Sequence, residues 1–166
     1  MSPWARSAAK LYALYVRLAN YLQSPLLLAV RLYWGWQFAQ DGWGKLGHIP
    51  RVTDYFASIG VPQPHITAYA IALLELAGGI LFIFGLGSRL IALPLTINMM
   101  MAYVFGDREA LHSIFSDPGK FYAADPYTFL FASLLILVFG PGKFALDTLI
   151  GHIAGGRMEA ASRETT

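Results

Sequence analysis

The stretch ITAYAIALLELAGGILFIFGL, residues 66–86, decides how this chain folds. Glu75 is its single charged residue, and the other positions are almost all apolar or small. A helix needs roughly 20 such residues to cross the hydrocarbon core of a membrane. A helix on the surface of a soluble domain would carry a polar face at every turn, and this stretch has none. We therefore predict a membrane-spanning helix here.

Three more stretches of the same kind surround it. They cover residues 24–38, 90–105 and 127–139, and Arg31 is the single charge within them. Each is slightly shorter than a span and needs flanking residues to cross the membrane. The four stretches together predict an all-α protein, an integral membrane four-helix bundle.

The composition agrees with a membrane protein. Of the 166 residues, 56% are hydrophobic and 13% are charged, whereas soluble domains have about 25% charged residues. The high apolar content excludes a disordered chain. The absence of cysteine excludes disulfides, thiolate metal sites and iron–sulfur clusters. The net charge of +2 is too small to indicate nucleic-acid binding, and the histidine spacing matches no metal-binding motif.

Two amphipathic patterns lie outside the predicted spans. Residues 4–22 place leucines at helical spacing with basic residues on another side, which predicts a helix at the membrane interface or a cytoplasmic extension of the first span. In the first long loop, residues 39–65, a second pattern ends before Gly60 and predicts a short interfacial helix. The chain therefore divides into an N-terminal amphipathic segment (1–23), a membrane domain (24–150) and a polar tail (151–166).

The distribution of lysine and arginine predicts the orientation. The N-terminal segment, the short turn after the second span and the tail together hold seven basic residues, and the two long loops hold four. Basic residues concentrate on the cytoplasmic side of membrane proteins. We therefore expect a multi-pass protein with both termini in the cytoplasm and both long loops outside.

Arg31 and Glu75 are the two charges within the predicted spans, where ionisable residues are costly and commonly functional. If the first span ends near Phe38, both lie about 10–14 Å from the outer end of their helices. We therefore predict an Arg31–Glu75 ion pair between neighbouring helices, which lowers the cost of burying either charge. Asn98 and Ser133 fall at similar depths in the third and fourth spans and complete a polar layer.

A ligand of this layer would meet aromatic and polarizable side chains. Trp34 lies one turn from Arg31, and Met99 to Met101 follow Asn98. Such a surface would suit a planar hydrophobic molecule such as a quinone, although core packing also explains the methionines. The candidate cofactor-binding residues are Arg31, Trp34, Glu75 and Asn98. The alternative is that the layer only locks the helices in register.

Several short motifs occur in order along residues 28–150. They are Arg31, Gly42 to Leu46, Tyr55-Phe56, Ile59 to Pro62, Glu75 with Gly78-Gly79, Gly85 to Gly87 with Arg89, and Gly140 to Lys143 followed by Asp147. This ordered set resembles the DoxX family of small bacterial membrane proteins.

The resemblance implies a four-helix bundle in the bacterial inner membrane and an association with redox and sulfur metabolism. The related DoxD proteins are linked to thiosulfate:quinone oxidoreduction with a partner subunit. Because this chain has no cysteine, it cannot itself cycle a disulfide or carry a persulfide. A redox role would therefore depend on a bound quinone or on partner proteins.

Three functions fit these observations. The first is a membrane subunit of a redox system, in which Arg31 stabilises negative charge on a quinol oxygen, Glu75 positions Arg31 or relays a proton, and a soluble or membrane oxidoreductase subunit is the partner. The second is a non-enzymatic membrane scaffold with a structural ion pair. The third is a small-solute transporter acting as a homo-oligomer, because four spans are few for alternating access. The residues alone do not distinguish an enzyme subunit from a scaffold.

Overall fold

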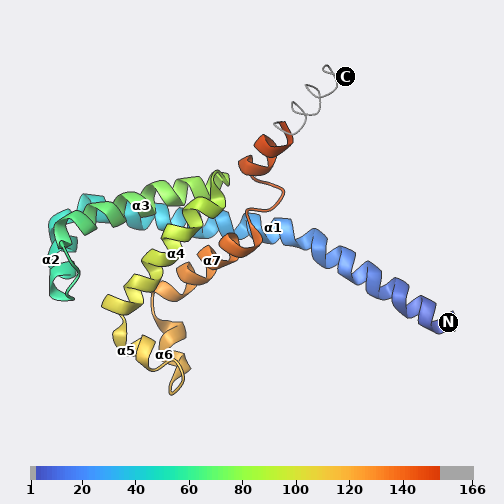
Figure 1. Cartoon of the computed structure of the whole chain (residues 1–166), viewed down its shortest axis with the longest axis horizontal. Helices are drawn as coiled ribbons and strands as arrows, with labels where there is room; N and C mark the ends of the chain where they lie inside the picture. Colours follow the sequence, from blue (N-terminus) through green and yellow to red (C-terminus); the bar gives the residue numbers. More distant parts are fainter. Residues whose placement is uncertain (1–2, 154–166) are drawn as a thin grey trace, which may run out of the picture.

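The structure is a computed structural model that describes residues 3–153 of the chain. Helices account for most of this part, and it contains no strand (Figure 1). The helices are α1 (Pro3–Gly47), α2 (Ile49–Ser58), α3 (Pro64–Phe84), α4 (Ser88–Phe105), α5 (Arg108–His112), α6 (Pro118–Ala123) and α7 (Pro126–Phe139). A further helix over residues 146–153 follows α7. The end of the predicted polar tail, residues 154–166, lies outside the described residues.

The first helix is longer than the sequence predicted. α1 runs for 45 residues without a break, although Pro25 inside it removes one backbone hydrogen bond. The amphipathic N-terminal segment is therefore continuous with the first predicted span, and it extends away from the other helices (Figure 1). The expectation that a loop begins at residue 39 is wrong, because α1 continues to Gly47.

Glycines explain why α1 continues through a sequence that resembles a loop. α1 packs mainly against α3. A Cβ atom added at Gly42 would lie 2.3 Å from the Leu76 nitrogen, and one at Gly79 would lie 2.5 Å from the Ala39 nitrogen. The two backbones thus approach as closely as small residues in membrane helices allow. Tertiary packing, rather than local helix preference, keeps this glycine-rich part of α1 helical.

The turn between α3 and α4 confirms the sequence prediction. α3 ends at Phe84, and Gly85 and Gly87 follow with φ values of 68° and 58°. Positive φ angles favour glycine because a side chain is strained there. α4 then begins at Ser88 and runs through Pro94 to Phe105. The tight turn makes α3 and α4 antiparallel neighbours, and α7 packs along α4.

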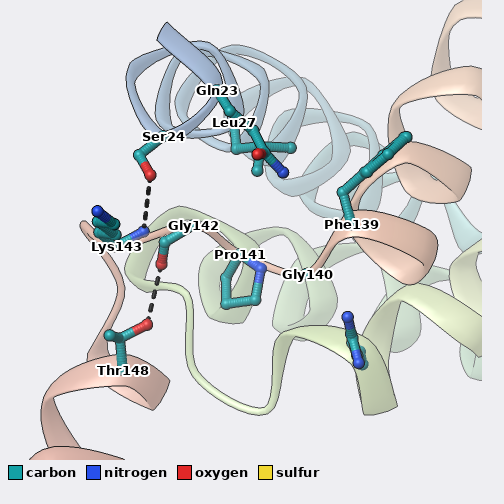
Figure 2. A pocket seen from close by; sticks show the side chains of 10 residues that line it. Gln23, Ser24, Leu27, Phe139, Gly140, Pro141, Gly142, Lys143 and Thr148 are labelled. Atoms are coloured by element: carbon teal, nitrogen blue, oxygen red, sulfur yellow. Dashed lines mark hydrogen bonds between the residues drawn. The ribbon is translucent and has the colours of Figure 1, made fainter. Parts of the chain in front are cut away.

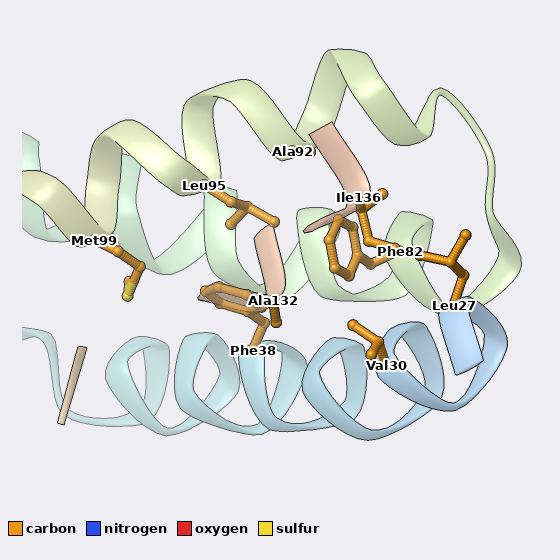
Figure 3. Close-up of a cluster of buried hydrophobic side chains, with 9 residues drawn as sticks. All are labelled: Leu27, Val30, Phe38, Phe82, Ala92, Leu95, Met99, Ala132 and Ile136. Carbon is orange, nitrogen blue, oxygen red and sulfur yellow. The ribbon is translucent and has the colours of Figure 1, made fainter. Parts of the chain in front are cut away.

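The main core joins α1, α3, α4 and α7. Phe38 of α1 makes edge-to-face contacts with Phe82 of α3 and Phe129 of α7. Figure 3 shows this cluster from the side, with residues of all four helices pointing toward one another. Its buried members are Leu27, Val30, Phe38, Phe82, Ala92, Leu95, Met99, Ala132 and Ile136.

The predicted short helix after the first span is present as α2. Its buried residue Ile49 packs with Ala68 and Ala72 of α3. α2 ends at Ser58, just before Gly60, whose φ of 81° is unfavourable for other residues. The helix that the pattern predicted therefore exists, and its location at a membrane surface stays a prediction.

The polarity of the bundle is that of a protein in lipid. Glu75 and Ser133 are 2% and 0% exposed, whereas Leu90 and Val138 are 83% and 63% exposed. Two helices, α3 and α4, are long and apolar enough to cross a membrane, and α7 is a shorter apolar helix of 14 residues. Apolar side chains outside and polar side chains inside are expected when hydrocarbon is the solvent.

Candidate functional site

The described residues contain two buried charged clusters. The first, the Glu75 cluster, consists of Lys45, Glu75 and Asn98. The Lys45 ammonium forms an ion pair with Glu75 Oε2, and Asn98 Nδ2 donates a hydrogen bond of 2.9 Å to Glu75 Oε1. Both carboxylate oxygens are thus engaged, by side chains from α1 and α4. The cluster links three helices through one carboxylate.

The two ends of the Glu75 cluster differ in access. The Glu75 side chain is 3% exposed, and the Lys45 side chain is 29% exposed. The Lys45 ammonium is directed inward to Glu75, so the exposed fraction of this residue belongs to a side chain that lies between Glu75 and the surface. An incoming molecule would therefore meet Lys45 first and Glu75 behind it.

A hydrogen-bonded pair lies two residues from Asn98. Thr96 Oγ1 donates to Ser133 Oγ over 3.0 Å, and Ser133 Oγ donates to the Leu130 carbonyl over 2.9 Å. Both side chains are buried. This pair links α4 to α7, so polar contacts extend through all four core helices. The polar positions predicted in the third and fourth spans are therefore inside the bundle.

The second cluster, the Arg31 cluster, consists of Arg31, the Phe144 carbonyl and Asp147. The Arg31 side chain is completely buried, and its Nη2 donates a hydrogen bond of 2.5 Å to the Phe144 carbonyl. Nε and Nη1 have no hydrogen-bond partner within residues 3–153. A Cβ atom at Gly85 would lie 1.8 Å from Nη1. The guanidinium is thus enclosed by the α3–α4 turn and the segment after α7.

Asp147 connects this cluster to the start of α4. Its Oδ1 accepts from the Gly87 N–H over 2.7 Å, and its Oδ2 accepts from the Ser88 N–H over 2.8 Å. A carboxylate is favourable at a helix N-terminus, where backbone N–H groups are free. Burial alone would raise the pKa of Asp147, but these N–H groups and the Arg31 charge lower it below its ordinary value.

The predicted Arg31–Glu75 ion pair is wrong. Arg31 lies beside Gly85, which follows Glu75 by ten residues in sequence, a rise of about 15 Å along a helix. The prediction assumed that the first helix ends near Phe38, which would place Arg31 close to its outer end. Because α1 continues to Gly47, Arg31 lies toward the opposite end of the bundle from Glu75. Lys45, one of the nine added residues, takes its place.

The structure brings together only two of the four candidate residues. Glu75 and Asn98 share a hydrogen bond, as a common polar layer requires. Trp34 is half-buried against the main core, with an edge-to-face contact to Tyr33 at a centroid distance of 4.9 Å. Met99 is buried in that core, whereas Met100 and Met101 are exposed on the outside of the bundle. The methionine run is therefore not a continuous lining beside Asn98.

The sequence-based reasoning missed Lys45 and Asp147 as site residues. Lys45 follows Asp41 by one helical turn, a charge spacing typical of helices, but the surrounding glycines resembled a loop. Asp147 follows Gly140 to Gly142 in a segment with no strong periodicity. Its role in capping α4 depends on a fold contact across sixty residues of sequence.

Comparison with known proteins agrees with this architecture. A helical bundle with polar groups inside, apolar side chains outside and two membrane-length helices is a membrane protein. The DoxX family pattern matches residues 26–108, which is half of the chain, and the chain therefore belongs to the DoxX family.

Three curated proteins are similar to this chain. The Bacillus subtilis protein named "Putative oxidoreductase CatD" is 28% identical over 123 residues, which cover 74% of this chain and 85% of that protein. The Escherichia coli inner membrane protein YqjF is 27% identical over 131 residues, covering 78% and 95%. A Mycobacterium tuberculosis protein described as an uncharacterized membrane protein is 27% identical over 135 residues, covering 74% and 80%. No solved structure matches the chain.

Proposed function

We propose that this chain is a four-span subunit of a redox system in the bacterial inner membrane, with both termini in the cytoplasm, and that it binds a quinone at the Glu75 cluster. The observation that carries the proposal is the buried Glu75 carboxylate, held by Lys45 and Asn98 from two other helices. Ionisable groups inside a membrane bundle commonly mark proton or substrate sites. The printed name of the B. subtilis relative, an oxidoreductase, supports the same class.

The residues of the Glu75 cluster fit a quinone carbonyl. Lysine has three N–H donors and the asparagine amide has two, and each has only one bond to Glu75 among the described contacts. Their remaining N–H groups can donate to a carbonyl oxygen that approaches from the exposed Lys45 side. Arg31 and Trp34 lie outside this proposed site.

A bound quinone would supply the redox chemistry, since its reduction to quinol takes up two electrons and two protons. Lys45 orients the carbonyl oxygen and, with Asn98, stabilises negative charge that develops there. Glu75 accepts and passes on protons between the cluster and water, because its partner Lys45 reaches the exterior. This chain has no cysteine thiol to supply the electrons, so the proposal assigns that role to a partner oxidoreductase subunit.

The test is quinone binding to the purified chain in nanodiscs. We expect saturable binding of ubiquinone or menaquinone that Glu75→Gln weakens about tenfold, the effect of losing one charge-assisted contact. Glu109→Gln is the matched control, because Glu109 is an exposed carboxylate that pairs only with Lys120 among its described contacts. Absence of saturable binding by the unchanged chain, or equal loss in both variants, would refute the quinone site.

One observation favours a scaffold as the second candidate. The Glu75 cluster joins α1, α3 and α4, and the Thr96–Ser133 pair joins α4 to α7. Such contacts could serve only to hold the helices together. A Lys45→Met, Glu75→Leu double variant distinguishes the two. If it folds, retains its protein partner and leaves the activity of the complex intact, the cluster is structural and the scaffold is correct.

A further inference from the structure

A pocket of about 340 Å³ lies at the end of the bundle away from the Glu75 cluster. Figure 2 shows it between α1 and the Gly140 to Lys143 loop. It lies where α7 ends at Phe139 and where α4 has just begun, at Arg89. In the predicted orientation, this end of the bundle lies at the cytoplasmic surface of the membrane.

The charge of the pocket has one sign. Arg89 and Lys143 line it, and no acidic side chain of the described residues does. Both side chains are exposed, and Arg89 Nη2 donates to the Val138 carbonyl over 3.2 Å. This bond places the guanidinium over the end of α7 while its other N–H groups can bind an anion. The pocket therefore suits a negatively charged oxygen ligand.

The rim of the pocket is built by hydrogen bonds. The Lys143 backbone N–H donates to Ser24 Oγ over 3.3 Å, which attaches the loop to α1. Thr148 Oγ1 donates to the Gly142 carbonyl over 2.9 Å, which attaches it to the following helix (Figure 2). A Cβ at Gly140 would lie 3.3 Å from Arg89 Nε, so glycine leaves room for the guanidinium. The two hydrogen bonds fix the backbone of the loop that carries Lys143, whose Nζ lies 5.8 Å from the centroid of the Tyr21 ring.

A second, separate hollow lies along the surface of α7. It measures about 180 Å³ and is lined only by apolar side chains, among them Leu134, Val138 and Phe139. Phe139 lines both hollows. The apolar hollow extends back to Phe131, eight residues or about 12 Å toward the membrane interior. The Phe139 side chain therefore borders both the cationic pocket and the apolar hollow.

We propose that these two hollows, which share Phe139, form a binding site for one anionic phospholipid of the cytoplasmic leaflet, with its headgroup phosphate at Arg89 and Lys143 and an acyl chain along α7. Basic pockets at the cytoplasmic ends of membrane helices are suited to acidic lipid headgroups. A free phosphate would use only the first hollow and leave the apolar one unexplained. The site is separate from the proposed quinone site and does not depend on it.

The test uses the full chain in a mild detergent, titrated with phosphatidylglycerol and followed by native mass spectrometry. We expect a saturable adduct of one lipid, and weaker adducts with phosphatidylcholine. Arg89→Gln with Lys143→Gln should weaken the phosphatidylglycerol adduct about thirtyfold, roughly fivefold for each basic residue. The matched control is Lys10→Gln with Arg17→Gln, which removes the same charge from the exposed part of α1. This control should change the affinity for phosphatidylglycerol by no more than about twofold. The two charges that it removes lie away from the pocket, and salt screens their attraction for the lipid.

Two further measurements identify the source of the anion and protect the test from misfolding. Val138→Trp fills the apolar hollow without changing charge, and it should weaken the phospholipid adduct. Lys143→Gln alone changes an exposed side chain and should fold normally, with about a fivefold loss. Equal losses in the two double variants, equal binding of phosphatidylcholine, or displacement of the lipid by an equal concentration of inorganic phosphate would each overturn the proposal.

Discussion

The Arg31 cluster and the Glu75 cluster each stabilise a buried charged side chain, but they do so with different partners. Glu75 has side-chain partners on both oxygens, and one of them, Lys45, reaches the exterior. Arg31 is completely buried, and its described partners are a backbone carbonyl and the charge of Asp147. One cluster therefore has a partly exposed member at the surface of the protein, whereas the other is enclosed at one end of the bundle.

The largest expected effect is on the packing that keeps the two clusters apart. Gly42→Ala adds a Cβ that would lie 2.3 Å from the α3 backbone, so α1 and α3 must separate. We expect the free energy of unfolding to fall by about 3 kcal/mol. Both clusters should loosen together, because both depend on the register of α1 against α3. Thermal unfolding in detergent, followed by tryptophan fluorescence, measures the change.

Gly44→Ala is the matched control, two residues further along the same helix. Apart from its chain neighbours and the nearby backbone of its own helix, no described atom lies within 4 Å of a Cβ added there. It should stabilise the helix by about 0.5–1 kcal/mol, since alanine loses less entropy than glycine. If both variants unfold at the same temperature, backbone contact between α1 and α3 does not set the register.

A smaller effect is expected when only the Arg31 cluster is changed. Asp147→Ala removes the acceptor for the Gly87 and Ser88 N–H groups and leaves Arg31 buried without its neighbouring negative charge. We expect a loss of about 2–3 kcal/mol. The folded-state pKa of Asp147 lies below its unfolded value, so its stabilisation is present above about pH 4 and is lost as the pH falls further.

Melting curves at several pH values check this assignment. The unchanged chain should lose stability below about pH 4, and the Asp147→Ala variant should lack the part of that loss due to Asp147. The Phe144 backbone carbonyl accepts the hydrogen bond from Arg31, and the Phe144→Ala variant keeps this carbonyl. This variant should therefore still lose stability below about pH 4. An identical acid transition with and without Asp147 would show that this carboxylate does not stabilise the fold.

The smallest expected effect is the coupling between the clusters. A double-mutant cycle of Arg31→Met and Glu75→Gln should give an interaction energy below about 0.5 kcal/mol, because the residues are far apart and share no hydrogen-bond partner within residues 3–153. The cycle of Glu75→Gln and Asn98→Leu should give about 0.6–1.7 kcal/mol, typical of polar contacts between membrane helices. A coupling of that size between Arg31 and Glu75 would restore the ion pair that the sequence first suggested.

Local patterns predicted much of the helical structure. The stretch 66–86 covers all of α3 (Pro64–Phe84) except its first two residues, and glycines with positive φ angles follow at 85 and 87. The helix before Gly60 is present as α2. These features depend on residues close in sequence, for which apolar periodicity and glycine conformation are direct signals.

The candidate site was predicted only in part. Glu75 and Asn98 are both buried, on the inner faces of the neighbouring helices α3 and α4, and there they share a hydrogen bond. The small or apolar residues that surround them in the sequence indicated these inner faces. The partner of Glu75 was missed because Gly42 and Gly44 favour a loop by local rules, and the α3 backbone overrides that preference. An error in the end of one helix therefore moved Arg31 by about 15 Å, roughly half the length of α3.

The continuity of α1 has a mechanical consequence. Arg31 and Lys45 are fourteen residues apart on one unbroken helix, so their separation of about 21 Å along its axis cannot change without bending it. A slide of one residue rise, about 1.5 Å, combined with the matching turn of 100° would withdraw Lys45 from Glu75 and Arg31 from the Phe144 carbonyl at once. Any motion of the exposed N-terminal half of α1 that rotates the helix therefore changes the contacts of Arg31 and of Lys45 at the same time.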